Sequence, residues 1–180
     1  MAATLLLVRH GETDWNREGR VQGHSDVPLN DTGRAQARAL AARLAAERVD
    51  AVYASDLRRA RDTACEVARA SGHPVTTTPD LREKHFGSWE GLTRDEILSR
   101  DPDALSGPWG DGETRDEMAD RVLHALREIA ARHEGETVVV VSHGGPLRAV
   151  QRTLGMVDDE PIVNCHVLRL VVDDGHFCTA

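Results

Sequence analysis

Two short runs of aliphatic residues constrain the fold of this chain more than any other feature. Residues 4–8 read TLLLV and residues 137–141 read TVVVV. Runs of this length without alternating polar residues are typical of strands that are buried on both faces of a parallel sheet. Segments with helical periodicity lie between them, so the sequence predicts a mostly parallel sheet covered by helices on both faces.

The other expected elements follow from the spacing of apolar residues and from turn residues. Asn30 can cap a helix in which apolar residues recur at helical spacing, and Gly72 can end another. Helices are expected from residue 30, over 56–70, over 93–99, along 118–129 and after residue 144. Further strands are expected over 51–54, 75–78, 163–172 and 177–179, the last two as an antiparallel end.

Length and composition fit one α/β domain over residues 1–180, a single-domain three-layer α/β/α sandwich. The chain has 180 residues, of which 40% are hydrophobic, enough for a sizeable core. The formal net charge of -8 argues against a nucleic-acid partner. No run approaches the roughly 18 apolar residues of a membrane helix, so no membrane partner is expected. The cysteines at 65, 165 and 178 are far apart, as is typical of reduced thiols in a cytoplasmic protein.

Both aliphatic runs are followed closely by a His-Gly step, His10-Gly11 in one case and His143-Gly144 in the other. Parallel strands end at the same edge of a sheet, and ligands bind beyond that edge. Each glycine lets backbone approach a ligand closely. The two histidines are therefore expected to lie together in a functional site.

The ligand of these histidines is expected to be phosphate. A metal is the alternative, with Glu83 as a third ligand, but Arg9 beside His10 makes a cation site electrostatically costly. Arginine instead suits the oxygens of an anion. The cluster of Arg58, Arg59 and Arg61 offers a second cation.

The residues around both histidines resemble the histidine phosphatase superfamily, also called phosphoglycerate mutase-like. The resemblance begins at the signature RHGET of residues 9–13 and continues in family order to about residue 155. The matching segments are 15–16 (WN), 22–23 (QG), 26–29 (DVPL), 55–60 (SDLRRA), 63–64 (TA), 81–83 (LRE), 87–91 (GSWEG) and 142–145 (SHGG).

The resemblance implies roles for nine residues. His10 would be the nucleophile that becomes phosphorylated, and Glu83 the general acid, with Glu113 as its one rival. Arg9, Arg59 and His143 would hold the phosphoryl group. Substrate binding is assigned to Asn16, Gln22, Gly23 and Gly144. His85 either reaches the pocket or stays on an exposed loop.

The expected function is hydrolysis of small phosphorylated metabolites through a phosphohistidine, with no metal and no other cofactor. The first alternative is a phosphoglycerate mutase, but known mutases of the family are longer between the segments that match Gly91 and Met118. A non-catalytic phosphate-ligand binder and a phosphoprotein phosphatase are the others. The strands over 163–172 and 177–179 could also offer an edge for a homodimer.

Overall fold

The computed structural model describes residues 1–104, 107, 109–156 and 161–179. Its strands form one sheet in the order β3-β2-β4-β1-β5-β6. The first four run parallel to one another, whereas β5 is antiparallel to β1 and β6 to β5. The strands are β1 Ala3–Arg9, β2 Ala51–Ser55, β3 Val75–Thr78, β4 Thr137–Ser142, β5 Val167–Asp173 and β6 His176–Thr179.

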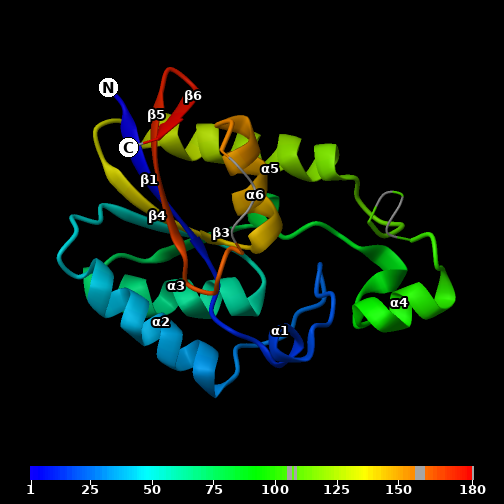
Figure 1. Ribbon diagram of the computed structural model, residues 1–180. Coiled ribbons are helices and arrows are strands. Elements are labelled where there is room, and N and C mark those ends of the chain that lie inside the picture. The colour runs from blue at the N-terminus through cyan, green and yellow to red at the C-terminus, as the bar shows by residue number, and fades with distance from the viewer. Residues whose placement is uncertain (105–106, 108, 157–160, 180) are drawn as a thin grey trace.

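Helices cover both faces of this sheet, as Figure 1 shows: α2 and α3 lie on one face, and α5 and α6 on the other. The helices are α1 Asp14–Glu18, α2 Asp31–Leu44, α3 Arg58–Ser71, α4 Arg94–Arg100, α5 Arg115–Arg132 and α6 Gly144–Thr153, with short 3-10 turns at Pro79–Leu81 and Gly87–Trp89. The predicted three-layer α/β sandwich is confirmed. None of the described helices is both long and apolar enough to cross a bilayer.

Strand β1 is central, which explains its unbroken aliphatic sequence. Leu5 and Leu7 pack in the core under α5 and α6, whereas Leu6 and Val8 pack under α2 and α3. All four side chains are buried. Because successive residues of a strand point to opposite faces, a strand covered on both sides needs an apolar residue at every position.

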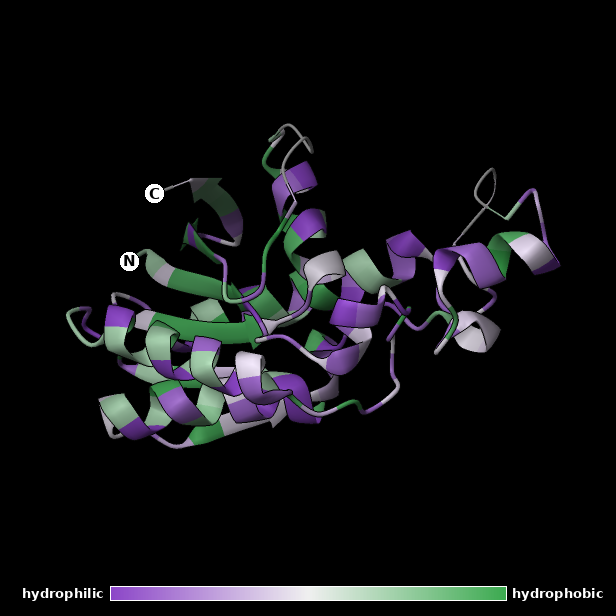
Figure 2. Cartoon of the chain, turned by 60° about the horizontal axis from the view of Figure 1, so that its bottom comes forward, coloured by the Kyte–Doolittle hydropathy of each residue, from purple (hydrophilic) through white to green (hydrophobic). Residues whose placement is uncertain are grey.

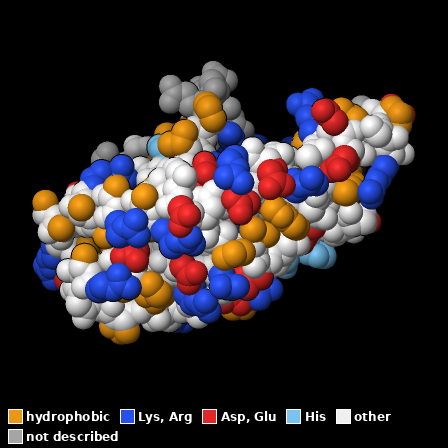
Figure 3. Space-filling model, turned by 90° about the horizontal axis from the view of Figure 1, so that it is seen from below, with side chains coloured by type: hydrophobic (Ala, Val, Ile, Leu, Met, Phe, Trp, Pro, Cys, Tyr) orange, Lys and Arg blue, Asp and Glu red, His pale blue; other side chains and the backbone are white. Residues whose placement is uncertain are grey.

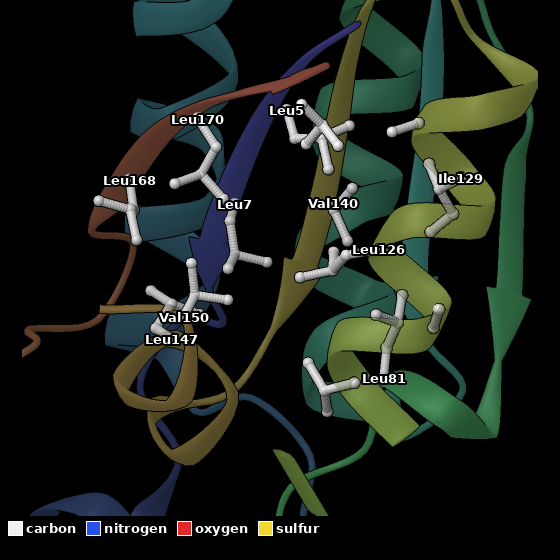
Figure 4. Packing of buried hydrophobic residues seen from close by; sticks show 14 of the residues in the cluster. Leu5, Leu7, Leu81, Leu126, Ile129, Val140, Leu147, Val150, Leu168 and Leu170 are labelled. Atoms are coloured by element: carbon white, nitrogen blue, oxygen red, sulfur yellow. The ribbon is translucent and has the colours of Figure 1, made fainter. Parts of the chain in front are cut away.

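The core beneath α5 and α6 is built from long aliphatic side chains (Figure 4). Leu126 and Ile129 of α5 face Val140 of β4, and Leu147 of α6 lies near Leu7 of β1. Helix α5 begins with a capping box in which Thr114 and Glu117 satisfy each other's backbone N–H groups. The capping box thus sets where α5 begins, and the packing of its apolar side chains holds it against the sheet.

Polar and charged residues lie on the outer sides of the helices, while the central strands are apolar (Figure 2). The molecule seen from below shows acidic and basic side chains interspersed (Figure 3). Helix α4 projects beyond the sheet in Figures 1 and 2. The outer layer is thus charged, as in other α/β sandwiches.

Three elements differ from the expectations. Helix α1 was not predicted, because five residues offer too little periodicity. Helix α3 begins at Arg58 rather than residue 56, because both Asp56 oxygens accept from Arg82 at 2.7 Å and the Arg58 amide donates to Asp26 instead. Strand β5 begins at Val167 rather than residue 163, since Cys165 has a φ of 58° and leaves the extended conformation.

Replacing Leu126 by alanine should lower the free energy of unfolding by about 2–5 kcal/mol, because it leaves a cavity in a fully buried part of the core. Urea unfolding measures the change. The matched control is Val163→Ala, whose side chain is 61% exposed and which should change stability by no more than about 0.5 kcal/mol. Equal effects of the two substitutions would contradict the packing described here.

Candidate active site

The register of β1 with β4 brings the two predicted histidines together. Val8 pairs with Val141 and Arg9 with Ser142, and the His10 amide then donates to the Ser142 carbonyl at 3.0 Å. His10 and His143 therefore leave the sheet side by side, with ring centres 5.1 Å apart and edge to face. Both side chains are buried.

One ring nitrogen of His10 is fixed by the backbone. Its Nδ1 lies 2.7 Å from the carbonyl oxygen of Gly11. A carbonyl oxygen can only accept a hydrogen bond, so Nδ1 carries the proton and Nε2 keeps its lone pair. The ring is thereby held in the tautomer that a nucleophile requires.

The surroundings keep both imidazoles neutral. Burial lowers the pKa of His10 well below its usual value, and the cations Arg59 and Arg9 lower it further. Burial lowers the pKa of His143 in the same way, again assisted by Arg59. Both rings are therefore uncharged near neutral pH.

The loop that follows His10 is packed backbone against backbone. The Gly11 amide donates to Thr63 Oγ1 at 3.0 Å. A Cβ on Gly11 would lie 2.6 Å from the carbonyl oxygen of Gly33, and a Cβ on Gly33 would lie 2.0 Å from that of Glu12. Neither glycine can take a side chain unless the backbone moves, so helix α2 presses directly on the loop.

Arg59 is the arginine of its cluster that reaches the site. Its side chain is fully buried, whereas Arg58 and Arg61 are both exposed. Its Nη1 donates to the Ser25 carbonyl at 2.8 Å and its Nη2 to the Gly23 carbonyl at 2.7 Å. Burial lowers the pKa of Arg59 to about 10, so the guanidinium remains charged at neutral pH.

Arg9 and Glu83 approach each other beside Gly144. A Cβ on Gly144 would lie 3.9 Å from Arg9 Nε and 4.0 Å from Glu83 Oε2. Arg9 Nη1 donates to the carbonyl of Ile162. Burial lowers the pKa of Arg9, and the neighbouring Glu83 opposes that shift. Both groups therefore lie next to Gly144, the residue that follows His143.

Glu83 is held at the start of α6. Its Oε2 accepts from the Gly145 amide at 3.0 Å and its Oε1 from the Lys84 amide at 2.9 Å. Its own backbone carbonyl accepts from Arg121 Nη2 at 2.8 Å. Glu113, the rival acid, is instead bound by Arg121 at 2.6 and 2.7 Å. Of the two acids, Glu83 is thus the one that lies at the start of α6, directly after His143.

Four buried side-chain nitrogen atoms have no hydrogen-bond partner within the described part of the chain: Arg9 Nε, Arg59 Nε, and Nδ1 and Nε2 of His143. Buried polar atoms normally find a partner, because an unsatisfied one costs about 1–3 kcal/mol. All four belong to residues predicted to surround the phosphoryl group. An anion with several oxygen atoms would accept from the Nε–H groups of both arginines and from the one N–H that a neutral His143 ring carries.

The predicted loop residues form hydrogen bonds with Thr13 or with Arg59. Gln22 Oε1 accepts from Thr13 Oγ1 at 2.8 Å, and Asn16 Oδ1 accepts from the Thr13 amide at 3.1 Å. Gly23, at a φ of 53°, supplies the carbonyl that holds Arg59. His85 has a side chain that is 45% exposed and stacks obliquely on His24, with ring centres 4.8 Å apart.

Two residues that the sequence did not single out support the site. The carboxylate of Glu90 accepts from the amides of His24, Ser25 and Phe86 at 2.9, 2.8 and 3.1 Å, and so holds the loop that orients Arg59. Asn164 donates to the His10 carbonyl at 3.0 Å. Glu90 lies inside segment 87–91, one of the segments that resemble the histidine phosphatase superfamily. That resemblance was the only feature of the sequence that pointed to Glu90.

No group of three or more His, Cys, Asp or Glu side chains in the described ranges is arranged to hold a metal ion. His10, His143 and Glu83 are therefore not gathered as ligands of one cation. The surrounding charge comes from arginines, which suits an anion.

Comparison with known proteins adds an independent test of the family. The chain is 47% identical over 157 residues to a metal-independent phosphoserine phosphatase of Arabidopsis thaliana, a match that covers 81% of this chain and 66% of that protein. It is 44% identical over 160 residues to phosphoglycerate mutase-like protein 4 of the same plant, covering 82% and 69%. The chain spans about two thirds of the length of these relatives.

A solved structure extends the likeness to three dimensions. The mycobacterial glucosyl-3-phosphoglycerate phosphatase in complex with VO3 has a TM-score of 0.84 and 32% identity, over 93% of this chain and 90% of that one. Residues 5–179 match the model of the histidine phosphatase superfamily (branch 1). The predicted family is confirmed: this chain belongs to branch 1 of the histidine phosphatase superfamily.

Proposed function

We propose that this protein is a phosphatase that hydrolyses phosphomonoesters of small metabolites through a phosphohistidine on Nε2 of His10. One observation carries the proposal. The buried nitrogen atoms of Arg9, Arg59 and His143 that have no partner within the described residues belong to the side chains that surround a neutral imidazole with a free lone pair. The relatives named as phosphatases support the same enzyme class.

In the first half-reaction, Nε2 of His10 attacks phosphorus and the bond from phosphorus to the ester oxygen breaks. The Gly11 carbonyl keeps Nδ1 protonated throughout. Charge on the equatorial oxygens is stabilised by the guanidinium groups of Arg9 and Arg59 and by an N–H of His143. These groups are already fixed by the fold, so little reorganisation is needed during the transfer.

Glu83 serves both half-reactions. Its protonated form gives a proton to the leaving alkoxide, and the resulting carboxylate then takes a proton from the water that attacks the phosphohistidine. Each carboxylate oxygen accepts one backbone N–H and retains a second lone pair for the proton. Phosphate and the regenerated imidazole complete the cycle.

The mutase alternative differs only in the group that accepts the phosphoryl group. The similarity to a protein named phosphoglycerate mutase-like keeps it open. Its acceptor would be a substrate hydroxyl, and water would have to be kept out. Between the 3-10 turn at Gly87–Trp89 and α5, α4 is the only described helix, which leaves little chain to close the site and favours hydrolysis.

Two further expectations stay predictions. A cytoplasmic location is supported by three free cysteines. A homodimer would use the edge strand β6, most of whose residues are exposed.

Replacing His10 by alanine should abolish phosphate release from p-nitrophenyl phosphate and small esters in the presence of EDTA, a fall of at least about a thousandfold. Wild-type protein stopped with alkali should retain an acid-labile phosphoryl group, and the variant should not. The matched control, His124→Ala on the exposed side of α5, should keep wild-type activity. Release that persists in the His10 variant would exclude this nucleophile.

Replacing Glu83 by glutamine should slow hydrolysis of alkyl phosphates by roughly a hundredfold or more, because their leaving group needs a proton. The effect on p-nitrophenyl phosphate should be much smaller, since nitrophenolate leaves without one. Steady-state kcat on both esters measures the difference. Glu113→Gln is the control, and it should change kcat on both esters by the same factor. An equal loss on both esters in Glu83→Gln would contradict the role of Glu83 as general acid.

Stability should fall as the pH drops below about 6.5, because His10 and His143 stay neutral when folded and take up protons when unfolded. Their stabilising contribution is complete above the unfolded pKa and declines by up to about 1.4 kcal/mol per pH unit for each ring. Urea unfolding between pH 7.5 and pH 5, a range that spans the unfolded histidine pKa of about 6.5, measures how the free energy of unfolding changes with pH. His143→Asn should reduce this dependence, and an unchanged slope would contradict the neutral state.

A further inference from the structure

The peptide group that joins Gly11 to Glu12 is held at both of its ends. Its carbonyl oxygen lies 2.7 Å from Nδ1 of His10. Its N–H, which belongs to Glu12, donates to Oε1 of Gln36 at 2.8 Å. No cis peptide bond is present in the described ranges, and in a trans peptide the C=O and the N–H point in opposite directions. Gln36 therefore keeps the carbonyl turned toward His10.

Turning this peptide over would reverse the hydrogen bonding of His10. The Glu12 N–H would then face Nδ1, which would have to accept from it, so the ring proton would move to Nε2. Nε2 is the atom that attacks phosphorus in the proposed reaction, so the turned state has no nucleophile. Gly11 has no Cβ to oppose the rotation. A partner on the Glu12 amide thus selects between an active and an inactive form of the ring.

Helix α2 brings Gln36 to this amide. Gly33 and Gln36 are three residues apart and so lie on the same side of the helix. A Cβ on Gly33 would lie 2.0 Å from the carbonyl oxygen of Glu12 and 2.8 Å from its amide nitrogen. The glycine therefore lets the helix backbone approach the loop closely, and the Gln36 side chain reaches the N–H from the next turn. Gln36 is half-buried, which limits competition from water.

The preceding peptide, which joins His10 to Gly11, is held by other residues. Its N–H donates to Thr63 Oγ1 at 3.0 Å, and its carbonyl accepts from Nδ2 of Asn164 at 3.0 Å. Neither bond restrains the next peptide, because that peptide can rotate about the single bonds on either side of it. Thr63 and Asn164 thus place the backbone of His10, whereas Gln36 controls the group that holds its ring proton.

We propose that Gln36 is a positioning residue that sets the tautomer of His10. By holding the Glu12 N–H, it directs the Gly11 carbonyl at Nδ1 and leaves Nε2 with its lone pair. The consequence for catalysis rests on the proposed phosphatase function, whereas the tautomer exists without turnover. During the transfer Nε2 forms the bond to phosphorus, the ester oxygen leaves with the electron pair of the broken bond, and Nδ1 keeps its proton. Gln36 itself exchanges no proton.

Nitrogen NMR of protein labelled with ¹⁵N at histidine tests the tautomer directly, because protonated and unprotonated ring nitrogen atoms differ widely in chemical shift. The spectrum is recorded at about pH 8, above the usual histidine pKa of about 6.5. The His10 signals are those missing from His10→Ala, and in the wild type the proton should lie on Nδ1. Gln36→Met keeps the length of the side chain but loses the acceptor, and it should move the proton to Nε2. Gln36→Glu keeps an acceptor oxygen and should keep the proton on Nδ1.

Steady-state kinetics gives a second readout. Gln36→Met should lower kcat roughly ten- to a hundredfold, as is typical when a partner that orients a reactive histidine is lost. KM should change little, because Arg9 and Arg59 still hold the phosphoryl group. Gln36→Glu should recover most of kcat. The matched control is Gln151→Met, at a half-buried glutamine of α6, which should leave both the tautomer and kcat unchanged.

The outcomes separate this role from the catalytic proposal. A folded Gln36→Met protein that keeps the proton on Nδ1 would overturn the role of Gln36, whether or not kcat falls. Should that variant fail to fold, Gln36→Asn withdraws the acceptor by one carbon atom and should move the proton in the same way; an unmoved proton would again overturn the role. A moved proton with unchanged kcat would retain the role of Gln36 and refute attack by Nε2 of His10.

Discussion

The parallel pairing of β1 with β4 is the interaction on which the rest of the structure depends. It extends from Thr4 opposite Thr137 to Arg9 opposite Ser142, and the His10 amide continues it by one further bond. A slip of one residue would turn the side chains of one strand to the opposite faces and separate the histidines. Because β1 and β4 are close-packed on both faces, such a slip would disrupt the packing of both cores. Hydrophobic packing thus sets the distance between His10 and His143.

Around that pairing, hydrogen bonds to backbone groups hold most of the polar and charged side chains of the site in place. Carbonyl groups of Gly23 and Ser25 hold Arg59, the carbonyl of Gly11 fixes His10, and the amides of Lys84 and Gly145 hold Glu83. Glu90 and Arg121 then anchor the loops that carry those backbone groups. The loops around the sheet edge can therefore vary in their outward side chains while the catalytic groups keep their places.

The sequence predicted the elements whose periodicity is strong. Both aliphatic strands, α2 and α5 were found, because burial on one or both faces leaves a regular pattern. The family and the place of His10 and His143 also followed from short segments. Helix α1, the late start of α3 and the role of Glu90 did not, since they depend on contacts between distant residues such as Asp56 with Arg82. The burial of Lys84 was invisible for the same reason: the sequence does not reveal that its ammonium donates to the carbonyl of Trp109.

The contact between Gly11 and Gly33 has a consequence for how such a protein can change. The two positions are 22 residues apart in the sequence, yet a methyl group at either one would collide with backbone at 2.6 Å or less. The atom that is struck is a main-chain oxygen in both cases, so shortening a neighbouring side chain would not make room. The backbone beside His10 is thus constrained at both glycines, and variation in the surroundings of His10 is left to the loops beyond this contact.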